Sequence, residues 1–510
     1  MKSIRLNQFL RPARTRCSLA LLVVAALLMP VRAAIAQTPS GATLPAEVRT
    51  ALERAELPRE ALAVWVQEVG GGTTPTPARP RLSWQADAPI NPASLTKLLT
   101  TYAALDLLGP AWTWTTPVWL QGPVNDGVLE GNLVIKGSGD PKLVLERLWL
   151  MFRKIRQLGV RQIRGDIVLD RSSFVVPEQN PAEFDGEPLR PYNVNADALL
   201  LNYKAVTLTF TPDPARAAAF VSVEPPLAGV RVDASVPFTT GPAGGCGDWR
   251  AALGAQFDDA STIRLTGSFN PACGEKSWSV AYVDPKTYNA RALLGIWYEM
   301  GGTLAGAVRD GIAPASVPSF VLSSPPLAEV VRDINKFSNN VMAQQLFLTL
   351  GLVQRGAGTP DNARAVLRQW AIDRLGANAA SLANLVMDNG SGLSREGRMT
   401  ARLLGRTLAS AWASPVMPEL LASLPVSGID GTARRSQAAA VRAHLKTGSL
   451  RDVRGIAGVV LGDSGRRYVV VAILNHSNAG SDAARAPLDA LLQWTARDGV
   501  SARADEAPAN

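Results

Sequence analysis

The chain has 510 residues, of which 47% are hydrophobic and 19% are charged, and its formal net charge is +9. This composition is typical of a globular protein with two or three domains and excludes a disordered or fibrous chain. Residues 1–36 hold six basic residues and no acidic one, so the rest of the chain carries only +3 and gives no reason to expect a nucleic-acid partner.

Residues 1–36 have the three parts of a secretory signal peptide. Basic residues precede an apolar run over residues 19–29, and Ala34-Ile35-Ala36 follows it. The apolar run is too short to span a bilayer comfortably, and no later segment resembles a membrane span. We therefore expect cleavage before Gln37 and a periplasmic protein without a transmembrane segment.

The next segments read as a strand, a helix and a long β-rich block. Residues 63–69 alternate as a half-buried strand does, and residues 94–108 repeat leucines at helical spacing until Gly109-Pro110. Residues 112–285 then show short strand-like runs between Gly, Pro and Asp clusters, with one amphipathic helix over 145–158. This block predicts a β-rich inserted region of two subdomains. Its strand-like runs are 132–135, 166–169, 206–210 and 262–269.

Helical patterns return after the inserted block, and a hairpin and a last helix follow. The predicted strands 456–461 and 468–474 flank the turn Gly462-Asp463-Ser464-Gly465. Residues 37–111 and 286–500 are thus predicted to form one discontinuous domain of mixed α/β (α+β) class, with 501–510 a disordered tail. The predicted helices are 287–300, 327–350, 362–375, 400–410 and 482–497.

Two cysteines, Cys246 and Cys273, remain once the signal peptide is removed. In an exported protein such a pair forms a disulfide more often than two reactive thiols. A bond that closes a loop of 27 positions stabilises the fold by about 3 kcal/mol. We interpret this pair as structural.

Several common site chemistries are missing. Only His444 and His476 are present, which excludes an H-E-x-x-H zinc site and makes no case for a metal or any other cofactor. The residues 462–465 match the letters around a trypsin-like serine, but His444 lies only 20 residues before Ser464 and the intervening run is needed for a strand. A hairpin turn explains the same letters.

The site chemistry that remains possible is a nucleophilic serine activated by a lysine. Ser94 and Lys97 lie three positions apart on a predicted helix, so their side chains share one face. A serine hydroxyl needs a base, and a lysine can act as one when burial or neighbouring positive charge lowers its pKa. Taken alone, the S-x-x-K pattern also occurs by chance.

Two further motifs follow in order. Ser338-Asn339-Asn340 lies within the predicted helix 327–350, and Lys446-Thr447-Gly448-Ser449 opens a strand-like segment. The ordered set S-x-x-K, S-x-N and K-T-G is the signature of penicillin-binding proteins and serine β-lactamases. The gap of 244 residues between Ser94 and Ser338 is too long for a compact β-lactamase. The chain therefore resembles the low-molecular-mass, class C penicillin-binding proteins, which are D-alanyl-D-alanine carboxypeptidases/endopeptidases. The runs 131–141, 165–170 and 388–395 are also similar to that family.

The resemblance implies a penicillin-binding/serine β-lactamase-like fold, an antiparallel sheet flanked by helices, and a role for each motif residue. Ser94 is expected to be the nucleophile and Lys97 its base. Ser338 is expected to relay a proton to the leaving amine, and Asn340 to hold Lys97 and the substrate amide. Lys446 and Thr447 are expected to bind the terminal carboxylate, Gly448 to leave the strand edge open, and Ser449 to complete the oxyanion hole. Arg395 and the stretch 185–192 are candidates for recognition of the stem peptide, although a surface loop explains them nearly as well.

The implied partners are peptidoglycan stem peptides, with β-lactam antibiotics as covalent inhibitors, and a homo-oligomer stays open. A serine β-lactamase uses the same motifs, but a small antibiotic needs no large inserted region. A non-catalytic wall-binding or penicillin-sensing module would have lost a motif member, and a transpeptidase would differ only in the nucleophile that reaches the acyl-enzyme. The balance between carboxypeptidase and endopeptidase activity is not fixed by the sequence.

Overall fold

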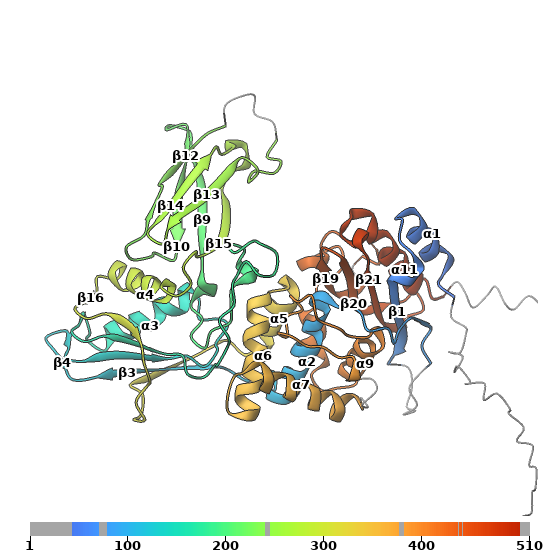
Figure 1. The fold of residues 1–510 in the computed structure, drawn as a ribbon, viewed down its shortest axis with the longest axis horizontal. Helices are drawn as coiled ribbons and strands as arrows, with labels where there is room; N and C mark the ends of the chain where they lie inside the picture. Colours follow the sequence, from blue (N-terminus) through green and yellow to red (C-terminus); the bar gives the residue numbers. More distant parts are fainter. Residues whose placement is uncertain are drawn as a thin grey trace, which may run out of the picture. The chain divides into compact units, whose positions relative to one another are not determined.

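The computed structural model describes residues 43–499 except 71–78, 240–244, 377–381, 437 and 441 (Figure 1). The predicted signal peptide and the predicted tail lie outside these residues. Among the residues that the structure describes, no helix is both long enough and apolar enough to cross a membrane.

A five-stranded antiparallel sheet forms the centre of the first part of the fold. Its strand order is β19-β20-β21-β1-β2, so strands from the two ends of the described chain lie side by side. The predicted pair of strands around residues 462–465 is confirmed, with Val459 opposite Val469. The strands are β1 (Leu62–Val69), β2 (Leu82–Trp84), β19 (Ala443–Leu450), β20 (Val453–Leu461) and β21 (Arg467–Asn475).

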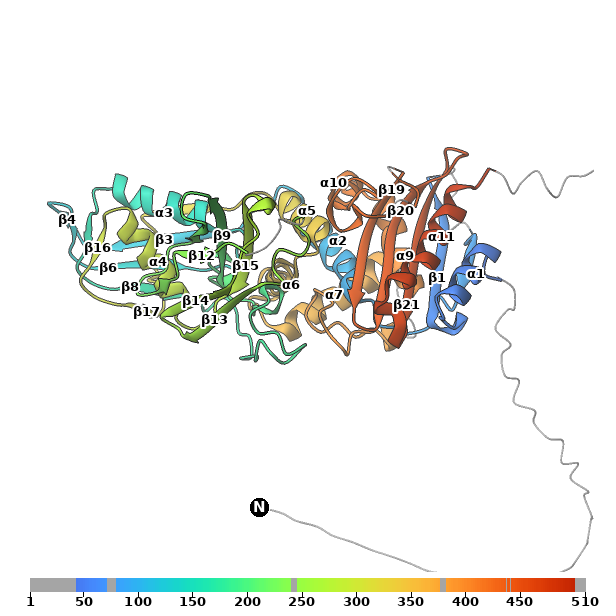
Figure 2. The same cartoon turned by 90° about the horizontal axis from the view of Figure 1, so that it is seen from above.

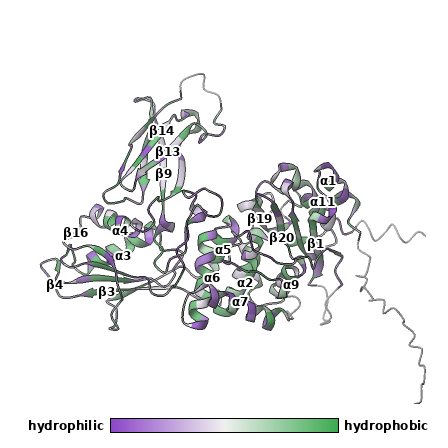
Figure 3. Ribbon diagram, viewed as in Figure 1, coloured by the Kyte–Doolittle hydropathy of each residue, from purple (hydrophilic) through white to green (hydrophobic). Residues whose placement is uncertain are grey.

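Helices cover both faces of this sheet (Figure 2). On one face, α1 (Ala46–Arg54) and α11 (Ala486–Ala496) share a hydrophobic core with strand residues such as Val64 and Val470. On the other face, buried residues of α2 contribute to a larger core. Helix α1, which covers the first face, is largely hydrophilic (Figure 3). The mixed fold class predicted from the sequence is confirmed. The helices whose residues contribute to the larger core are α2 (Thr96–Leu108), α5 (Leu327–Phe337), α6 (Asn340–Arg355), α7 (Pro360–Leu375), α9 (Ala401–Trp412) and α10 (Met417–Ser423).

The prediction of one continuous helix over 327–350 is wrong. Ser338 ends α5 in the left-handed conformation, with φ of +56°, and α6 begins at Asn340. The Asn339 side chain accepts a hydrogen bond from the backbone N–H of Met342 at 3.0 Å and caps α6. Hydrophobic spacing continues across the break, which is why the pattern alone predicts a single helix.

The inserted region begins with a second layered unit. Its five-stranded sheet has the order β17-β8-β6-β3-β18, and a smaller sheet has the order β16-β7-β5-β4. Helices α3 (Leu145–Gln157) and α4 (Tyr288–Glu299) pack in the same core as these strands, with Phe152 and Trp297 5.3 Å apart between ring centroids. The strands are β3 (Thr115–Gln121), β4 (Val124–Asn125), β5 (Val128–Leu129), β6 (Asn132–Lys136), β7 (Gln162–Ile163), β8 (Ile167–Asp170), β16 (Thr303–Leu304), β17 (Val308–Asp310) and β18 (Phe320–Ser323).

The strand pairing differs from the predicted boundary at residue 285. Residues 288–323, expected in the discontinuous domain, pair instead within the inserted unit, where β17 lies parallel to β8 and β18 antiparallel to β3. These pairings join segments 141 positions apart for β17 and β8, and 202 to 208 positions apart for β18 and β3. Local composition carries no information on such distant partners, so the change from inserted region to helical domain falls after β18.

A second β-unit follows within the inserted region. Its four-stranded sheet has the order β12-β10-β9-β15, and a three-stranded sheet has the order β11-β14-β13. Phe210 and Phe269 stack in its core, and the predicted disulfide between Cys246 and Cys273 is confirmed there. The strands are β9 (Ala205–Asp213), β10 (Ala218–Glu224), β11 (Arg231–Val232), β12 (Ser235–Pro237), β13 (Leu253–Asp259), β14 (Thr262–Gly267) and β15 (Lys276–Ala281).

Candidate active site

Ser94 sits in a tight turn at the start of α2. The turn is a short 3₁₀ helix, Ala93–Leu95, and its first residue, Ala93, has a φ of +47°. The Asn91 side chain accepts from the backbone N–H of Ala93 at 2.9 Å, and the Thr96 hydroxyl donates to the Ala93 carbonyl at 2.9 Å. The turn holds Ser94 partly exposed at a helix N-terminus, where the helix dipole favours developing negative charge.

Lys97 is fully buried one turn further along α2. Its Nζ atom lies 3.0 Å from the Ser94 hydroxyl, 2.6 Å from Oδ1 of Asn340 and 2.6 Å from the Ser391 carbonyl oxygen. Burial, and then the nearby charge of Lys446, hold the pKa of Lys97 well below that of an ordinary lysine. A neutral amine at this position can accept a proton.

The loop 388–395 supplies one of these contacts. Asn389 Oδ1 accepts from both the backbone N–H and the hydroxyl of Ser391, and the Thr100 hydroxyl donates to the Gly390 carbonyl at 2.8 Å. These bonds aim the Ser391 carbonyl at Lys97. Sequence reasoning noted the run 388–395 only as a similarity and missed this function, because the contact uses a backbone atom. The turn-forming letters Asp-Asn-Gly-Ser-Gly are the signal that could have found it.

Ser338 and Lys446 form a second pair beside the first. The left-handed backbone of Ser338 presents its hydroxyl between the two helices, where it accepts a hydrogen bond from Lys446 Nζ at 2.9 Å. Lys446 also donates to the Thr447 carbonyl at 2.7 Å. Lys446 is fully buried, and this burial lowers its pKa to about 7. A non-glycine residue in the left-handed region at such a site is a strained position that the surroundings maintain.

Strand β19 lies at the edge of its sheet and carries the third motif. Ser427 donates to the carbonyl of Ala443 and Leu445 donates to the carbonyl of Pro425, so odd-numbered residues turn their backbone groups away from β20. By the two-residue alternation of a strand, the backbone N–H of Ser449 also faces the open edge. A Cβ atom on Gly448 would lie 3.0 Å from the Pro92 carbonyl and 3.4 Å from the Ala93 Cβ, so glycine lets β19 approach the Ser94 turn closely.

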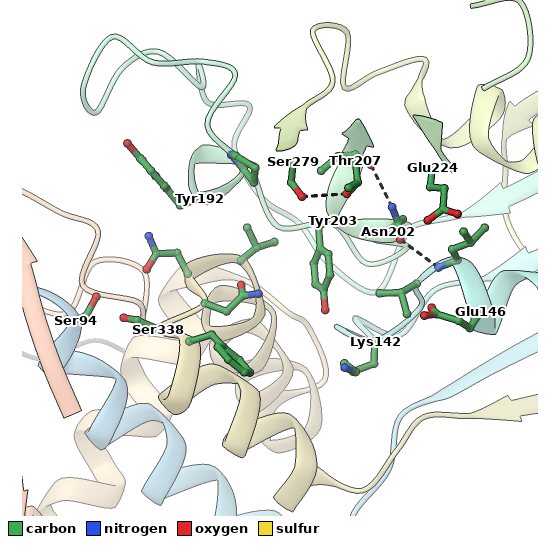
Figure 4. Close-up of a pocket in the computed structure, with 18 residues that line it drawn as sticks. Ser94, Lys142, Glu146, Tyr192, Asn202, Tyr203, Thr207, Glu224, Ser279 and Ser338 are labelled. Atoms are coloured by element: carbon green, nitrogen blue, oxygen red, sulfur yellow. Dashed lines mark hydrogen bonds between the residues drawn. The ribbon is translucent and has the colours of Figure 1, made fainter. Parts of the chain in front are cut away.

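Two cavities meet at Ser94 and Ser338. The first, of about 740 Å³, extends from Ser94 past Asn339 and Asn340 to residues of the inserted region such as Tyr203 and Glu224 (Figure 4). The second, of about 680 Å³, extends over Thr447, Gly448 and Ser449. Each is large enough to hold a peptide segment on its side of the serine.

Arg395 lies outside the linings of these two cavities. Its guanidinium group is 3.2 Å from Asp452 and lies over the Phe184 ring, 4.5 Å from the ring centroid. Nearby, Asp185 accepts hydrogen bonds from the Tyr192 hydroxyl and the Asn193 amide, and Tyr192 lines the first cavity. Arg395 thus links Asp452, in the turn between β19 and β20, to Phe184, which directly precedes the stretch 185–192.

The family model of the D-Ala-D-Ala carboxypeptidase 3 (S13) family matches residues 44–496. A D-alanyl-D-alanine carboxypeptidase of Actinomadura sp. (strain R39) is 30% identical over 415 residues, which cover 76% of this chain and 74% of that protein. D-alanyl-D-alanine carboxypeptidase DacB of Haemophilus influenzae is 24% identical, with coverage of 78% and 83%.

The fold is likewise similar to a solved structure. The crystal structure of penicillin binding protein 4 (DacB) from Haemophilus influenzae matches with a TM-score of 0.69 and 20% identity, over 88% of this chain and 97% of that one. A structure of the same protein complexed with a β-lactam matches with a TM-score of 0.63 and 19% identity, over 88% and 98%. At this level of identity, the match establishes the fold.

Proposed function

Because the chain belongs to the D-Ala-D-Ala carboxypeptidase 3 (S13) family, and is therefore a serine hydrolase, we propose that it cleaves D-alanyl-D-alanine bonds of peptidoglycan stem peptides with Ser94 as nucleophile. We further propose that it acts as an endopeptidase on peptide cross-links, and that it does so in the periplasm after residues 1–36 are removed. β-Lactams would acylate the same serine.

The contacts of Lys97 carry this proposal. A neutral lysine amine has two N–H donors and one lone pair. Asn340 Oδ1 and the Ser391 carbonyl can only accept, so they take both N–H groups at 2.6 Å each. The lone pair is then left for the third neighbour, the Ser94 hydroxyl at 3.0 Å. This arrangement orients Lys97 as a general base toward Ser94.

In the first half-reaction, Ser94 Oγ bonds to the carbonyl carbon of the penultimate D-alanine while its proton passes to Lys97. The backbone N–H groups of Ser94 and Ser449 stabilise the oxyanion, an interaction whose loss typically costs about 10²–10³ in rate. The C–N bond then breaks, and the Ser338 hydroxyl passes a proton to the departing amine. Ser338 can do so because it lies within 2.9 Å of Lys446, which replaces its proton.

Before the second half-reaction, the proton that Lys97 took from Ser94 replaces the one that Lys446 gave up, so Lys97 is neutral again. Lys97 then removes a proton from a water molecule, whose oxygen bonds to the acyl carbon. The ester C–O bond breaks and Ser94 regains its proton. Lys446 and Thr447, which lie on the edge strand β19 next to Ser338, bind the terminal carboxylate of the intact substrate. Asn340 holds both Lys97 and the substrate amide. Arg395 is proposed to act on the stem peptide through the stretch 185–192, because it lies over Phe184, next to that stretch, and does not itself line either of the two cavities.

The test is covalent labelling followed by product analysis. Wild-type protein incubated with benzylpenicillin should gain one penicilloyl group by intact mass, and digestion of the adduct should place it on Ser94. The Ser94→Ala variant should gain none, while a Ser464→Ala variant at the hairpin turn should label normally. Purified muropeptides should lose terminal D-alanine or split at the cross-link only with wild type. Labelling of Ser94→Ala, or rapid turnover of penicillin, would refute the proposal.

A further inference from the structure

The second cavity at Ser94 is rich in arginine. Four arginines line it, against a single carboxylate, Asp489. Two of them, Arg434 and Arg435, follow the 3₁₀ turn Gly431–Ala433, and the other two come from β20 and from the turn before α11. The arginines are Arg434, Arg435, Arg454 and Arg485.

Most of this positive charge is not neutralised within the protein. In the described part of the chain, the only ion pair of the four arginines joins Arg485 to Asp482, at 3.3 Å and with both side chains largely exposed. Arg454 donates to the backbone carbonyls of Ala479 and Gly480 at 2.9 Å each, which fixes its position without cancelling its charge. The Asp489 carboxylate accepts a hydrogen bond from the Ser436 hydroxyl at 3.2 Å. The cavity is therefore a cationic surface beside the nucleophile.

The segment Asp430–Arg435, here called the arginine loop, is held by specific contacts next to the catalytic motifs. The buried Lys336 amine pairs with Asp430 at 2.6 Å, and a Cβ atom on Gly431 would lie 2.5 Å from the Lys336 carbonyl. One residue further, the Thr432 hydroxyl hydrogen-bonds the Thr447 hydroxyl at 2.6 Å. Thr447 is the residue proposed to bind the carboxylate of the leaving group. The arginines thus lie on the leaving-group side of Ser94.

The size of the cavity exceeds what a single D-alanine requires. A volume of about 680 Å³ is in the range of sites for ligands with tens of atoms. When the bond cleaved is a cross-link, the leaving group is a second stem peptide, which carries several carboxylates. Arginine is well suited to such groups because its guanidinium binds carboxylates through two parallel N–H bonds.

We propose that the cavity lined by Arg434, Arg435, Arg454 and Arg485 is a subsite for an acidic peptide leaving group, and that it selects cross-linked stem peptides over a lone D-alanine. This inference rests on the proposed function and adds the specificity of its leaving-group side. The first cavity differs in sign, since its lining carries Glu146 and Glu224, while its one lysine, Lys142, is paired with Asp333. The two sides of the serine are therefore electrostatically distinct.

The test compares two substrates in the full-length mature protein. One is a cross-linked muropeptide dimer, and the other an uncross-linked stem pentapeptide that releases only D-alanine. The variant Arg434→Gln/Arg435→Gln removes two exposed charges of the subsite. The matched control, Arg355→Gln/Arg406→Gln, removes two exposed helix arginines that do not line the cavity. Penicillin acylation of Ser94 reports whether each variant keeps its fold and nucleophile.

The Arg434→Gln/Arg435→Gln variant should lose roughly tenfold in kcat/KM on the dimer, mainly through a higher KM, and less than about twofold on the pentapeptide. For wild type, raising salt from about 50 to 500 mM should weaken the dimer preference, because exposed charges are screened. Equal losses on both substrates, a similar loss in the control, or no loss on the dimer would overturn the subsite while leaving the proposed function intact. A wild type that is acylated at Ser94 but never cleaves the dimer would overturn both the subsite and the proposed endopeptidase activity, while leaving the carboxypeptidase proposal intact. Absence of any acylation would instead refute the proposed function.

Discussion

Gly392 presses against the carbonyl of Ala93, the residue before the nucleophile. Its φ is +78°, and a Cβ atom there would lie 1.9 Å from the Ala93 oxygen. The loop that directs the Ser391 carbonyl at Lys97 and the turn that presents Ser94 are thus in direct backbone contact. Any shift in one of them must move the other, so the base and the nucleophile are positioned as one unit.

The variant Gly392→Ala should therefore separate the loop from the turn. We expect its rate of acylation by penicillin to fall more than about tenfold, because misplacement of reacting groups by about 1 Å already costs up to 10²-fold. Gly301→Ala is the matched control, since Gly301 has a φ of +74° but nothing within 4 Å of an added Cβ. That variant should lose only the roughly 1 kcal/mol of a left-handed alanine. Equal acylation rates in the two variants would contradict the coupling.

The two buried lysines make a prediction about pH. Protonated Lys97 cannot accept the Ser94 proton, so the acylation rate should fall as pH drops through the pKa of Lys97. The charge of Lys446 lowers that pKa. Removing the charge in Lys446→Gln should raise the pKa of Lys97, so the acidic limb of the pH–rate profile should move to higher pH. Lys446→Arg keeps the charge and should leave the limb where it is. Stopped-flow acylation at saturating penicillin measures both, and an unmoved limb in Lys446→Gln would exclude the electrostatic link.

The pair Lys336–Asp430 should affect both stability and the cationic subsite. Lys336 is 7% exposed in its side chain and Asp430 39%, so Asp430→Asn leaves a buried ammonium without a partner. We expect the free energy of unfolding to fall by about 2 kcal/mol, less than for a fully buried pair because Asp430 is partly solvated.

The double variant Lys336→Met/Asp430→Asn should recover part of that loss, since no unpaired charge remains. Urea unfolding of the two variants and the wild type measures both effects. A double variant as unstable as the single one would show that the pair has no charge-specific role. Because the arginine loop begins at Asp430, KM for the dimeric muropeptide should rise in both variants.

The disulfide between Cys246 and Cys273 should stabilise its own β-unit without influencing catalysis. Neither cysteine lines the cavities at Ser94. Replacing both by serine should lower the stability of this unit by about 3 kcal/mol, the value for a loop of 27 positions. Hydrogen exchange should rise in residues 205–281, while the acylation rate of Ser94 should stay within twofold of wild type. A large loss of acylation would show that the β-unit supports the active site.

Much of this site could be predicted because its proposed chemistry uses side chains that occur in a recognisable sequence pattern. Ser94, Lys97, Ser338 and Lys446 are required in a fixed order. The alternation over residues 63–69 predicts β1, and the runs 456–461 and 468–474 on either side of a turn predict β20 and β21. The two hydrogen-bonded pairs, Lys97 with Ser94 and Lys446 with Ser338, agree with that order. Their roles stay proposals until the labelling and kinetic tests are made.

Three features could not be predicted in this way. The Ser391 carbonyl is a backbone atom, and its direction depends on a loop conformation fixed by hydrogen bonds to Asn389. The helix break at Ser338 needs a left-handed serine, which local propensity disfavours. The pairing of β17 with β8 joins segments about 140 positions apart, and no local pattern records it.

The edge of β19 has one more consequence. Among the described residues, Val426 bridges His444 and the Leu445 N–H donates to the Pro425 carbonyl, so the first half of this edge is covered. The stretch from Lys446 to Leu450 is the part that offers backbone groups to a visiting chain. A ligand that pairs there must be extended over a few residues and free of its own secondary structure. Folded proteins conceal their backbones in helices and sheets and meet neither condition. Backbone pairing at this edge therefore favours short extended peptides as ligands and disfavours folded proteins.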